Sequence, residues 1–172
     1  MDSFLAFKLI RKSKIIVRKE EKNLMFFSSL VGNEKVKEIL TNTIQNGKLS
    51  HSYMFLGIEG IGKKLFAKEL AKIILCTNEE QKLCNKCKSC IEFDSENNPD
   101  LYILDNGKES IKIEQIRQMQ SKILEKPIIS NKKVYIINNA DNMTKEARKL
   151  FTKDIRRATV ICYIYIGHYR TA

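Results

Sequence analysis

The sequence lacks any apolar run approaching the ~20 residues that a helix needs to cross a bilayer. Its first 24 residues also lack a clean apolar block followed by a small-residue cleavage site, which a secretory signal would carry. We therefore predict a cytoplasmic chain that makes no membrane contact. With 172 residues, the chain has room for one domain with a real core, or for one domain with appendages.

A basic central region is also missing, although the formal net charge of the chain is +11. Residues 1–24 contribute +4 and residues 148–172 contribute +5, so the middle of the chain contributes only +2. A surface that follows nucleic-acid phosphates needs clustered Lys and Arg side chains. Charge alone therefore does not predict contact with DNA.

The middle of the chain is organised around a strand, a glycine-rich loop and a helix. The apolar run Tyr53–Leu56 leads into Gly57–Lys64, after which apolar residues recur at helical spacing at Leu65, Phe66, Leu70, Ile73 and Ile74. In this order the three parts form a phosphate cradle, because loop N–H groups approach oxyanions and a lysine reaches the outer phosphates. The candidate residues for phosphate binding, with ATP as the candidate ligand, are Gly57, Gly60, Gly62, Lys63 and Lys64.

Position 64 departs from the phosphate-loop motif. It is Lys where a Ser or Thr hydroxyl would hold Mg²⁺. We therefore expect a loop that can cradle phosphate but handles the metal poorly, and we name no catalytic residue. The alternative is a glycine turn that binds no ligand. His51, in the polar connection before the strand, is expected to be a loop residue near the nucleotide face.

Four cysteines, Cys76, Cys84, Cys87 and Cys90, follow the loop helix with the spacing C-x₇-C-x₂-C-x₂-C. Disulfides rarely persist in the cytoplasm, so four thiolates in so short a span predict a tetrahedral Zn²⁺ site. Four sulfur ligands leave no open position for a substrate, so the zinc would be structural. The alternatives are unligated thiols, or a small zinc-ribbon nucleic-acid binder, which the lack of interleaved aromatics disfavours.

The rest of the central region alternates helical and strand patterns. A helix is expected from the cap residue Asn33 to Gly47, and another from Ile113 until Pro127 stops it. Leu101–Asp105 and Val134–Ile137 read as strands. This alternation predicts an α/β fold, a parallel sheet with helices on both faces, whose ligands bind at the carboxyl ends of the strands.

The end of the last predicted strand lacks the usual catalytic carboxylates. A phosphate-loop ATPase places an Asp there for Mg²⁺ and commonly a Glu beside it to activate water. Asn138 and Asn139 occupy these positions, and an amide is a weaker ligand for a hard cation and takes no proton. Asp141 comes three residues too late for the same role and is expected to cap the helix that begins near Thr144.

Taken in order, these motifs resemble the bacterial DNA polymerase III clamp-loader subunits of the AAA+ class, most closely the delta-prime subunits. The resemblance covers residues 25–147 and rests on the following segments: Leu30–Gly32, Leu49–Tyr53, Gly57–Lys64, the four cysteines, Asn98–Asp100, Ile113–Arg117 and Val134–Met143. It implies a P-loop NTPase-like core with an inserted zinc module over residues 76–90. It also implies a component of the DNA polymerase holoenzyme, a nucleotidyltransferase complex that replicates DNA.

Within this class, the motor subunits of tau/gamma type are the alternative. They keep Lys-Ser or Lys-Thr in the loop and Asp-Glu at the strand end, whereas this chain has Lys64, Asn138 and Asn139. The resemblance thus implies a delta-prime scaffold with little or no ATP hydrolysis. Its partners would be the motor and delta subunits of a ring, and indirectly the sliding clamp and primed DNA.

The two ends of the chain fall outside this resemblance. Residues 1–24 are interpreted as a poorly ordered basic leader, because Met25 begins a normal domain start. Residues 148–172 lack the helix and strand of the family. Reading their codons from the second base permits Leu-Leu-Lys-Ile-Leu-Glu-Glu-Pro-Pro and then Ser-Tyr-Val-Ile-Phe-Ile-Leu-Val. The hypothesis is a single-base shift near Arg148-Lys149, which predicts a truncated fragment whose sheet lacks an interior strand and whose stability is low.

Overall fold

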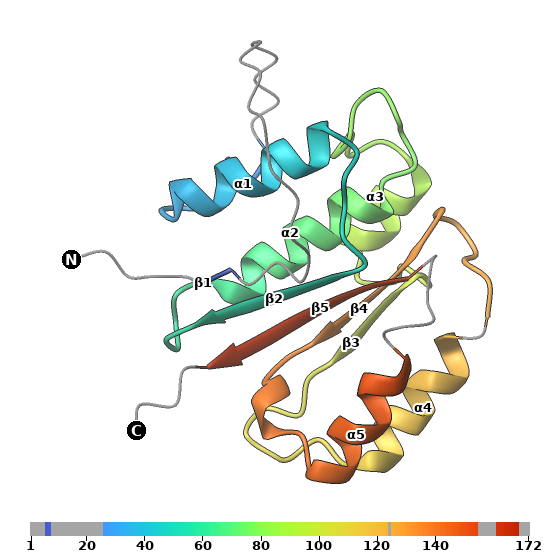
Figure 1. Cartoon of the computed structure of the whole chain (residues 1–172). Helices are drawn as coiled ribbons and strands as arrows, with labels where there is room; N and C mark the ends of the chain where they lie inside the picture. Colours follow the sequence, from blue (N-terminus) through green and yellow to red (C-terminus); the bar gives the residue numbers. More distant parts are fainter. Residues whose placement is uncertain (1–5, 8–25, 124, 155–160, 169–172) are drawn as a thin grey trace.

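The computed structural model describes residues 6–7, 26–123, 125–154 and 161–168, and shows a single sheet between two layers of helices (Figure 1). The strands of the sheet are β1 (Ala6–Phe7), β2 (Ser52–Gly57), β3 (Leu101–Leu104), β4 (Lys133–Ile137) and β5 (Ile161–His168). Their order across the sheet is β1-β2-β5-β4-β3. All neighbours are parallel except β1, which pairs antiparallel with β2. The predicted α/β class is therefore confirmed.

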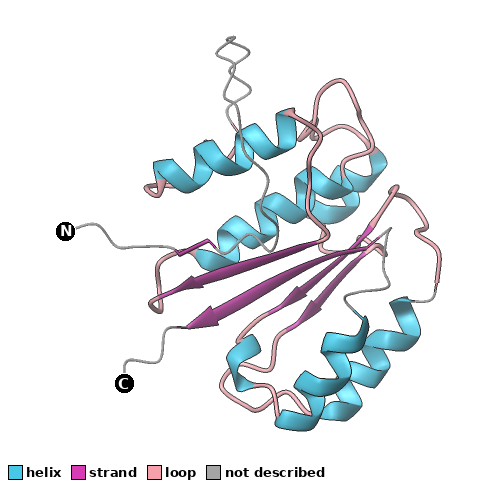
Figure 2. Ribbon diagram, viewed as in Figure 1, coloured by secondary structure: helices cyan, strands magenta, loops and turns pink. Residues whose placement is uncertain are grey.

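The helices lie on both faces of the sheet (Figure 2). One face carries α1 (Glu34–Gln45), α2 (Lys63–Leu75) and α3 (Lys88–Asp94), and the other carries α4 (Ile113–Ile123) and α5 (Lys145–Asp154). Each face has its own hydrophobic core. In the first, Phe66 and Leu70 of α2 pack with Phe55 of β2, and in the second, Ile116 of α4 packs with Tyr135 of β4.

The helix predicted after the glycine loop is present, and the apolar residues that define it are buried except at one position. Phe66, Leu70, Ile73 and Ile74 are buried, as their spacing predicts, but the side chain of Leu65 is 59% exposed. Leu65 lies in the first turn of α2, and a period of ~3.6 residues puts it on the opposite side of the helix from the buried Ile74. At α1, Asn33 does occupy the cap position, but its side chain makes no capping hydrogen bond.

The expectation that the sheet lacks an interior strand is wrong. Strand β5 lies between β2 and β4 and pairs with both along its length. Ile164, Tyr165 and Ile166 are buried, and Phe151 of α5 packs edge to face on Tyr165 with ring centroids 5.3 Å apart. A central parallel strand is covered on both faces and therefore needs a continuous apolar run, which residues 161–167 supply as printed.

The predicted leader, residues 1–24, lies outside the described residues apart from β1, and its disorder stays a prediction. Among the helices that the structure describes, none is both long and apolar enough to cross a membrane.

Candidate functional site

The glycine loop lies where the parallel strands end, at the start of α2. It leaves β2 at Gly57 and enters α2 at Lys63. Gly60 and Gly62 have φ angles of 80° and 88°, a left-handed conformation that glycine adopts without the cost that a Cβ would bring. The loop therefore turns tightly enough to direct backbone N–H groups at a bound anion.

The predicted cradle lysine, Lys63, faces into this loop. Its side chain is only 4% exposed, and its Nζ donates to the carbonyl oxygens of Gly57 at 3.0 Å and Ile58 at 2.6 Å. Burial lowers the pKa of Lys63, while the negative charges of Glu59 and Asp141 act in the opposite direction. The ammonium group thus lies inside the loop, where the outer phosphates of a nucleotide would bind.

Lys64 binds a carboxylate from another strand. Its Nζ lies 2.7 Å from Oδ2 of Asp105, which directly follows β3. Hydrogen bonds from Lys64 and then from Asn138 lower the pKa of Asp105 to about 2. Position 64, the end of β3 and the end of β4 therefore meet at one point. The sequence identified Lys64 and Asn138, but it gave no sign that Asp105 would join them.

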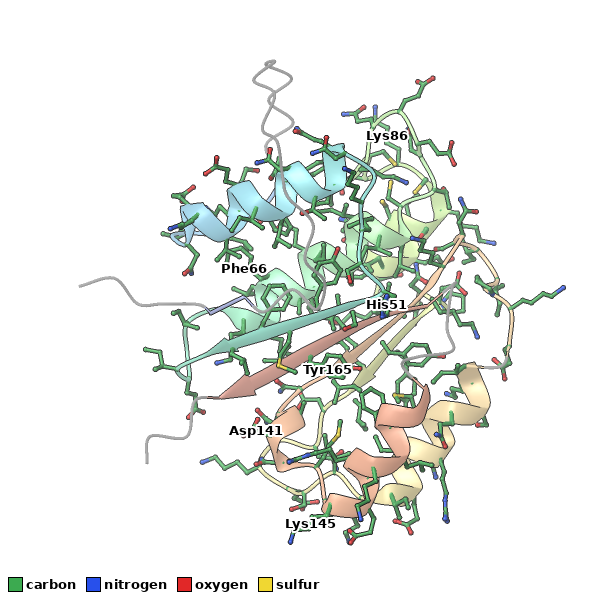
Figure 3. The ribbon with its side chains drawn as sticks, in the orientation of Figure 1. His51, Phe66, Lys86, Asp141, Lys145 and Tyr165 are labelled. Carbon is green, nitrogen blue, oxygen red and sulfur yellow. The ribbon has the colours of Figure 1, made fainter. Side chains whose placement is uncertain are left out.

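The turn after β4 brings Asp141 back toward the loop, which corrects the expected capping role of this residue. Asp141 lies in the 3₁₀ turn η1 (Ala140–Asn142), and its charge acts on Lys63 (Figure 3). The cap of α5 is Thr144, whose Oγ1 accepts from the N–H of Ala147 at 3.2 Å. Asn139 is turned toward another segment, because its amide donates to the carbonyl of Gly107.

His51 is not near the nucleotide face. It precedes the first residue of β2, whereas the glycine loop follows the last, and Figure 3 shows His51 and Asp141 toward opposite ends of the strands. The direction of β2 explains the error, because a strand of six residues spans roughly 20 Å. His51 is exposed there, at the opposite end of β2 from the glycine loop.

The four cysteines converge on one point beside α2 and α3. Their Sγ atoms all lie within 4.8 Å of one another, and the Sγ of Cys76 is 3.7 Å from that of Cys84 and 4.0 Å from that of Cys87. A tetrahedral zinc with Zn–S bonds of ~2.3 Å requires S···S distances of about 3.8 Å. The four sulfur atoms therefore lie close enough together to hold a zinc ion, and two of their separations are near the ideal value.

Hydrogen bonds prepare two of these sulfurs for the thiolate form. N–H groups of Lys86 and Cys87 lower the pKa of Cys84. Burial raises the pKa of Cys87, but hydrogen bonds from Thr77 and Cys90 outweigh it and bring this pKa to about 5. The pKa of Cys90 is raised, mainly by burial. A buried thiol of this kind ionises when a metal ion supplies the compensating charge.

A buried polar network attaches this cysteine module to the sheet, and the sequence pattern did not reveal it. Asp100 is 2% exposed, and its carboxylate accepts the N–H groups of Ile128, Ile129 and Ser130 at 2.6–2.8 Å. The side chain of Asn98 donates to Ser89 of α3 at 2.9 Å. The segment Asn98–Asp100, which the sequence marked only as part of the family resemblance, thus joins α3 to the loop before β4.

Comparison with known proteins finds subunits of DNA polymerase III among the relatives of this chain. A protein-family model described as "DNA polymerase III, delta subunit" matches residues 32–155. The chain is 37% identical over 119 residues to DNA polymerase III subunit delta' of Bacillus subtilis, covering 69% of this chain and 36% of the relative. It is 33% identical over 132 residues to subunit gamma/tau of Mycoplasma pneumoniae, covering 77% of this chain and 19% of the relative. It thus spans about a third and a fifth of their lengths.

One solved structure has the same fold at low identity. The Holliday junction branch migration motor RuvB of Thermotoga maritima superposes with a TM-score of 0.50 at 17% identity, covering 84% of this chain and 40% of that protein. At this identity the likeness concerns the fold alone. The fold is that of the AAA+ P-loop proteins, as the order of motifs predicts.

Proposed function

The chain belongs to the DNA polymerase III delta-subunit family of clamp-loader proteins, and from this premise we propose that it is the N-terminal region of a delta-prime subunit. In this role it holds the motor and delta subunits in a ring that loads the sliding clamp onto primed DNA, and it hydrolyses little or no ATP itself. A replication subunit of this kind works in the cytoplasm, where bacterial DNA lies.

The observation that carries this proposal is the ion pair between Lys64 and Asp105. A motor subunit needs a hydroxyl at position 64 to hold Mg²⁺ and carboxylates at the end of β4 to bind the metal and activate water. Here position 64 carries an ammonium group paired with Asp105 at 2.7 Å, and β4 ends in Asn138 and Asn139. The phosphate loop keeps its shape and its Lys63, but the groups for hydrolysis are replaced.

The cysteine module supports a structural zinc ion in the same proposal. Cys76, Cys84, Cys87 and Cys90 would hold it through four sulfur atoms, with no position left for a substrate. The zinc would fix the segment between α2 and α3, and the side chain of Asn98, which donates to Ser89 of α3, would connect that helix to the start of β3.

An ATP-hydrolysing motor subunit is the second candidate, because relatives named gamma/tau match about as well as the delta' relative. Steady-state ATP turnover by the purified chain separates the two candidates. We expect no turnover above that of the Lys63→Ala variant. Turnover that this substitution abolishes would instead establish a motor subunit with an unusual metal site.

We also propose that the coding sequence carries a single-base shift near Arg148-Lys149. Supporting it, both reading frames give an apolar run at residues 161–167, where the structure has the central strand β5. Resequencing the coding DNA from Ala147 to Val160 tests this, and we expect one base to be gained or lost. Independent reads with an unchanged frame would refute the shift and leave residues 148–172 as the native end of this region.

A further inference from the structure

Lys64 is placed where the phosphate loop usually recruits a divalent cation. In the common motif the residue after the cradle lysine offers a hydroxyl to Mg²⁺, and the ion bridges the outer phosphates. Here that residue brings its own positive charge. The side chain of Lys64 is half exposed, and its ammonium group is anchored by Asp105, which also accepts a hydrogen bond from Asn138.

Lys64 has hydrogen-bonding capacity left for a ligand. An ammonium group has three donors, and one is directed at Oδ2 of Asp105 at 2.7 Å. The side chain of Lys64 is half exposed, so a ligand can approach it from solvent. Lys63 lies one residue earlier on the same helix start, with its own Nζ inside the loop. Two ammonium groups therefore extend from consecutive residues at the start of α2, one into the loop and one toward the end of β3.

We propose that Lys64, held by Asp105 and Asn138, takes the place of the divalent cation, so that the loop binds nucleotide phosphates without Mg²⁺. This inference rests on the proposed role of Gly57–Lys64 as a phosphate cradle. The inference goes further than that role because it states which form of the ligand the cradle binds: the nucleotide without a metal ion. Asn138 in place of a carboxylate fits this selection, because a second negative charge beside Asp105 would call for a second cation.

The sign of the Mg²⁺ effect follows from electrostatics. Mg²⁺ bound to the outer phosphates of ATP would approach the ammonium of Lys64, and two like charges at contact distance repel. The described residues also offer no cluster of three or more carboxylate, histidine or cysteine ligands for an ion besides the four cysteines. Mg²⁺ should therefore weaken nucleotide binding, whereas it strengthens binding in a metal-dependent phosphate loop.

Calorimetric titration of the purified chain with ATP, in EDTA and in excess MgCl₂, tests this directly. We expect a Kd about fivefold lower in EDTA, the scale of a partly exposed charge contact. In Lys64→Thr, which restores the hydroxyl, we expect binding to weaken in EDTA and to strengthen when Mg²⁺ is added. Asp105→Asn keeps Lys64 but removes the carboxylate that holds its ammonium group, so the preference for metal-free ATP over the Mg²⁺ complex should shrink.

Lys68→Thr is the matched control. It makes the same change in charge one turn further along α2, where Lys68 pairs with Glu96 at 3.0 Å instead of facing the loop. This variant should keep the wild-type response to Mg²⁺. The proposal is overturned if Mg²⁺ strengthens wild-type binding, above all if Asp141→Asn abolishes that gain, because Asp141 would then hold the metal. Absence of binding in both buffers overturns it as well, while the scaffold role, judged by ATP turnover, would stand.

Discussion

Single residues at this site act through partners far away in the sequence. Asp100 illustrates this, because its carboxylate accepts three backbone N–H groups from residues 128–130 while lying almost fully buried. Hydrogen bonds to a charged acceptor stabilise a fold more than those between neutral groups. Asp100 thereby satisfies a segment that has no strand or helix partner and fixes the entry of the chain into β4.

Asp100→Asn should therefore destabilise the protein by about 2–4 kcal/mol, because an amide loses the charge and turns N–H donors toward backbone N–H groups. The measurement is urea unfolding followed by circular dichroism. Asp94→Asn is the control: Asp94 lies on the surface and pairs with Lys72, so its loss should cost below about 1 kcal/mol. Equal losses of unfolding free energy in the two variants would show that the three backbone hydrogen bonds to Asp100 stabilise the fold no more than a surface ion pair does.

The Lys64–Asp105 pair predicts a defined pH dependence. The pKa of Asp105 in the folded chain is lowered to about 2 from 3.8. A lowered pKa contributes stability that is present above the unfolded value and is lost as the pH falls toward 2. Because Lys64 is half exposed, solvent screening limits this contribution to under about 1 kcal/mol.

In Lys64→Met, the pKa of Asp105 should rise toward its ordinary value. The carboxyl carbon of Asp105, followed by NMR between pH 3 and pH 5 (the range around an ordinary Asp pKa of ~3.9), should then titrate in the variant and stay ionised in the wild type. Identical titration curves would mean that Asn138 and the backbone alone set this pKa.

Whether a site residue could be predicted from the sequence depends on the kind of contact that it makes. The substitutions at Lys64, Asn138 and Asn139 were visible because a motif assigns a role to each position. Asp105 and Asp141 were missed for a physical reason. Asp105 meets Lys64 across 41 residues, and a 3₁₀ turn carries Asp141 back to the loop, so neither contact has a periodic signal in the sequence.

At the scale of elements, the cysteine module differs from the rest of the fold. Its helix α3 has seven residues, and the segment from Cys76 to Cys87 has no regular secondary structure. A helix this short is unstable alone, and the segment buries little apolar surface. Metal–thiolate bonds would supply the missing stabilisation, because four sulfurs fix the chain at four places.

Purified under reducing conditions, the chain should contain one zinc ion, measured by plasma emission spectroscopy. Cys87→Ser should lose it, whereas Lys86→Ser, at an exposed position in the same loop, should retain it. Chelation should speed amide hydrogen exchange between Cys76 and Cys90 and leave β2 and β4 protected, because the sheet has its own core. A reduced wild-type protein free of metal after purification in zinc would contradict the site.

Most elements were predictable because their burial is regular. The helices α1, α2 and α4 follow the 3.6-residue period, and β4 reads as an apolar run because every one of its residues is buried. Leu65 was misassigned because it was grouped with apolar neighbours, although a period of ~3.6 residues puts it on the opposite side of α2 from Ile74. The short strand β1 carries too few residues for any pattern.

At the scale of the whole molecule, β5 is the strand that connects the two halves of the sheet, β1-β2 and β4-β3. It joins β2 to β4, and Ile164 lies 0% exposed in the core shared with α2. The expected gap in the sheet was wrong because residues 148–172 lack the family's sequence pattern but still contain an apolar, β-forming run. A central parallel strand requires only a run of apolar residues with high β-propensity, and the Ile, Tyr and Cys residues of β5 form such a run. Both the given reading frame and the shifted frame encode such a run, so the given sequence forms the strand.

Ile164→Asp should therefore abolish cooperative unfolding of the entire described sheet, because it buries an unpaired charge in the core between the sheet and α2 at a cost above about 4 kcal/mol. Val31→Asp is the control, since Val31 is 96% exposed and a charge there should change stability by no more than about 0.5 kcal/mol. Thermal unfolding by circular dichroism and amide exchange of β2 and β4 give the readout. If Ile164→Asp still unfolds cooperatively with protected β2 and β4, then β5 is dispensable and α2 alone holds the two halves of the sheet together.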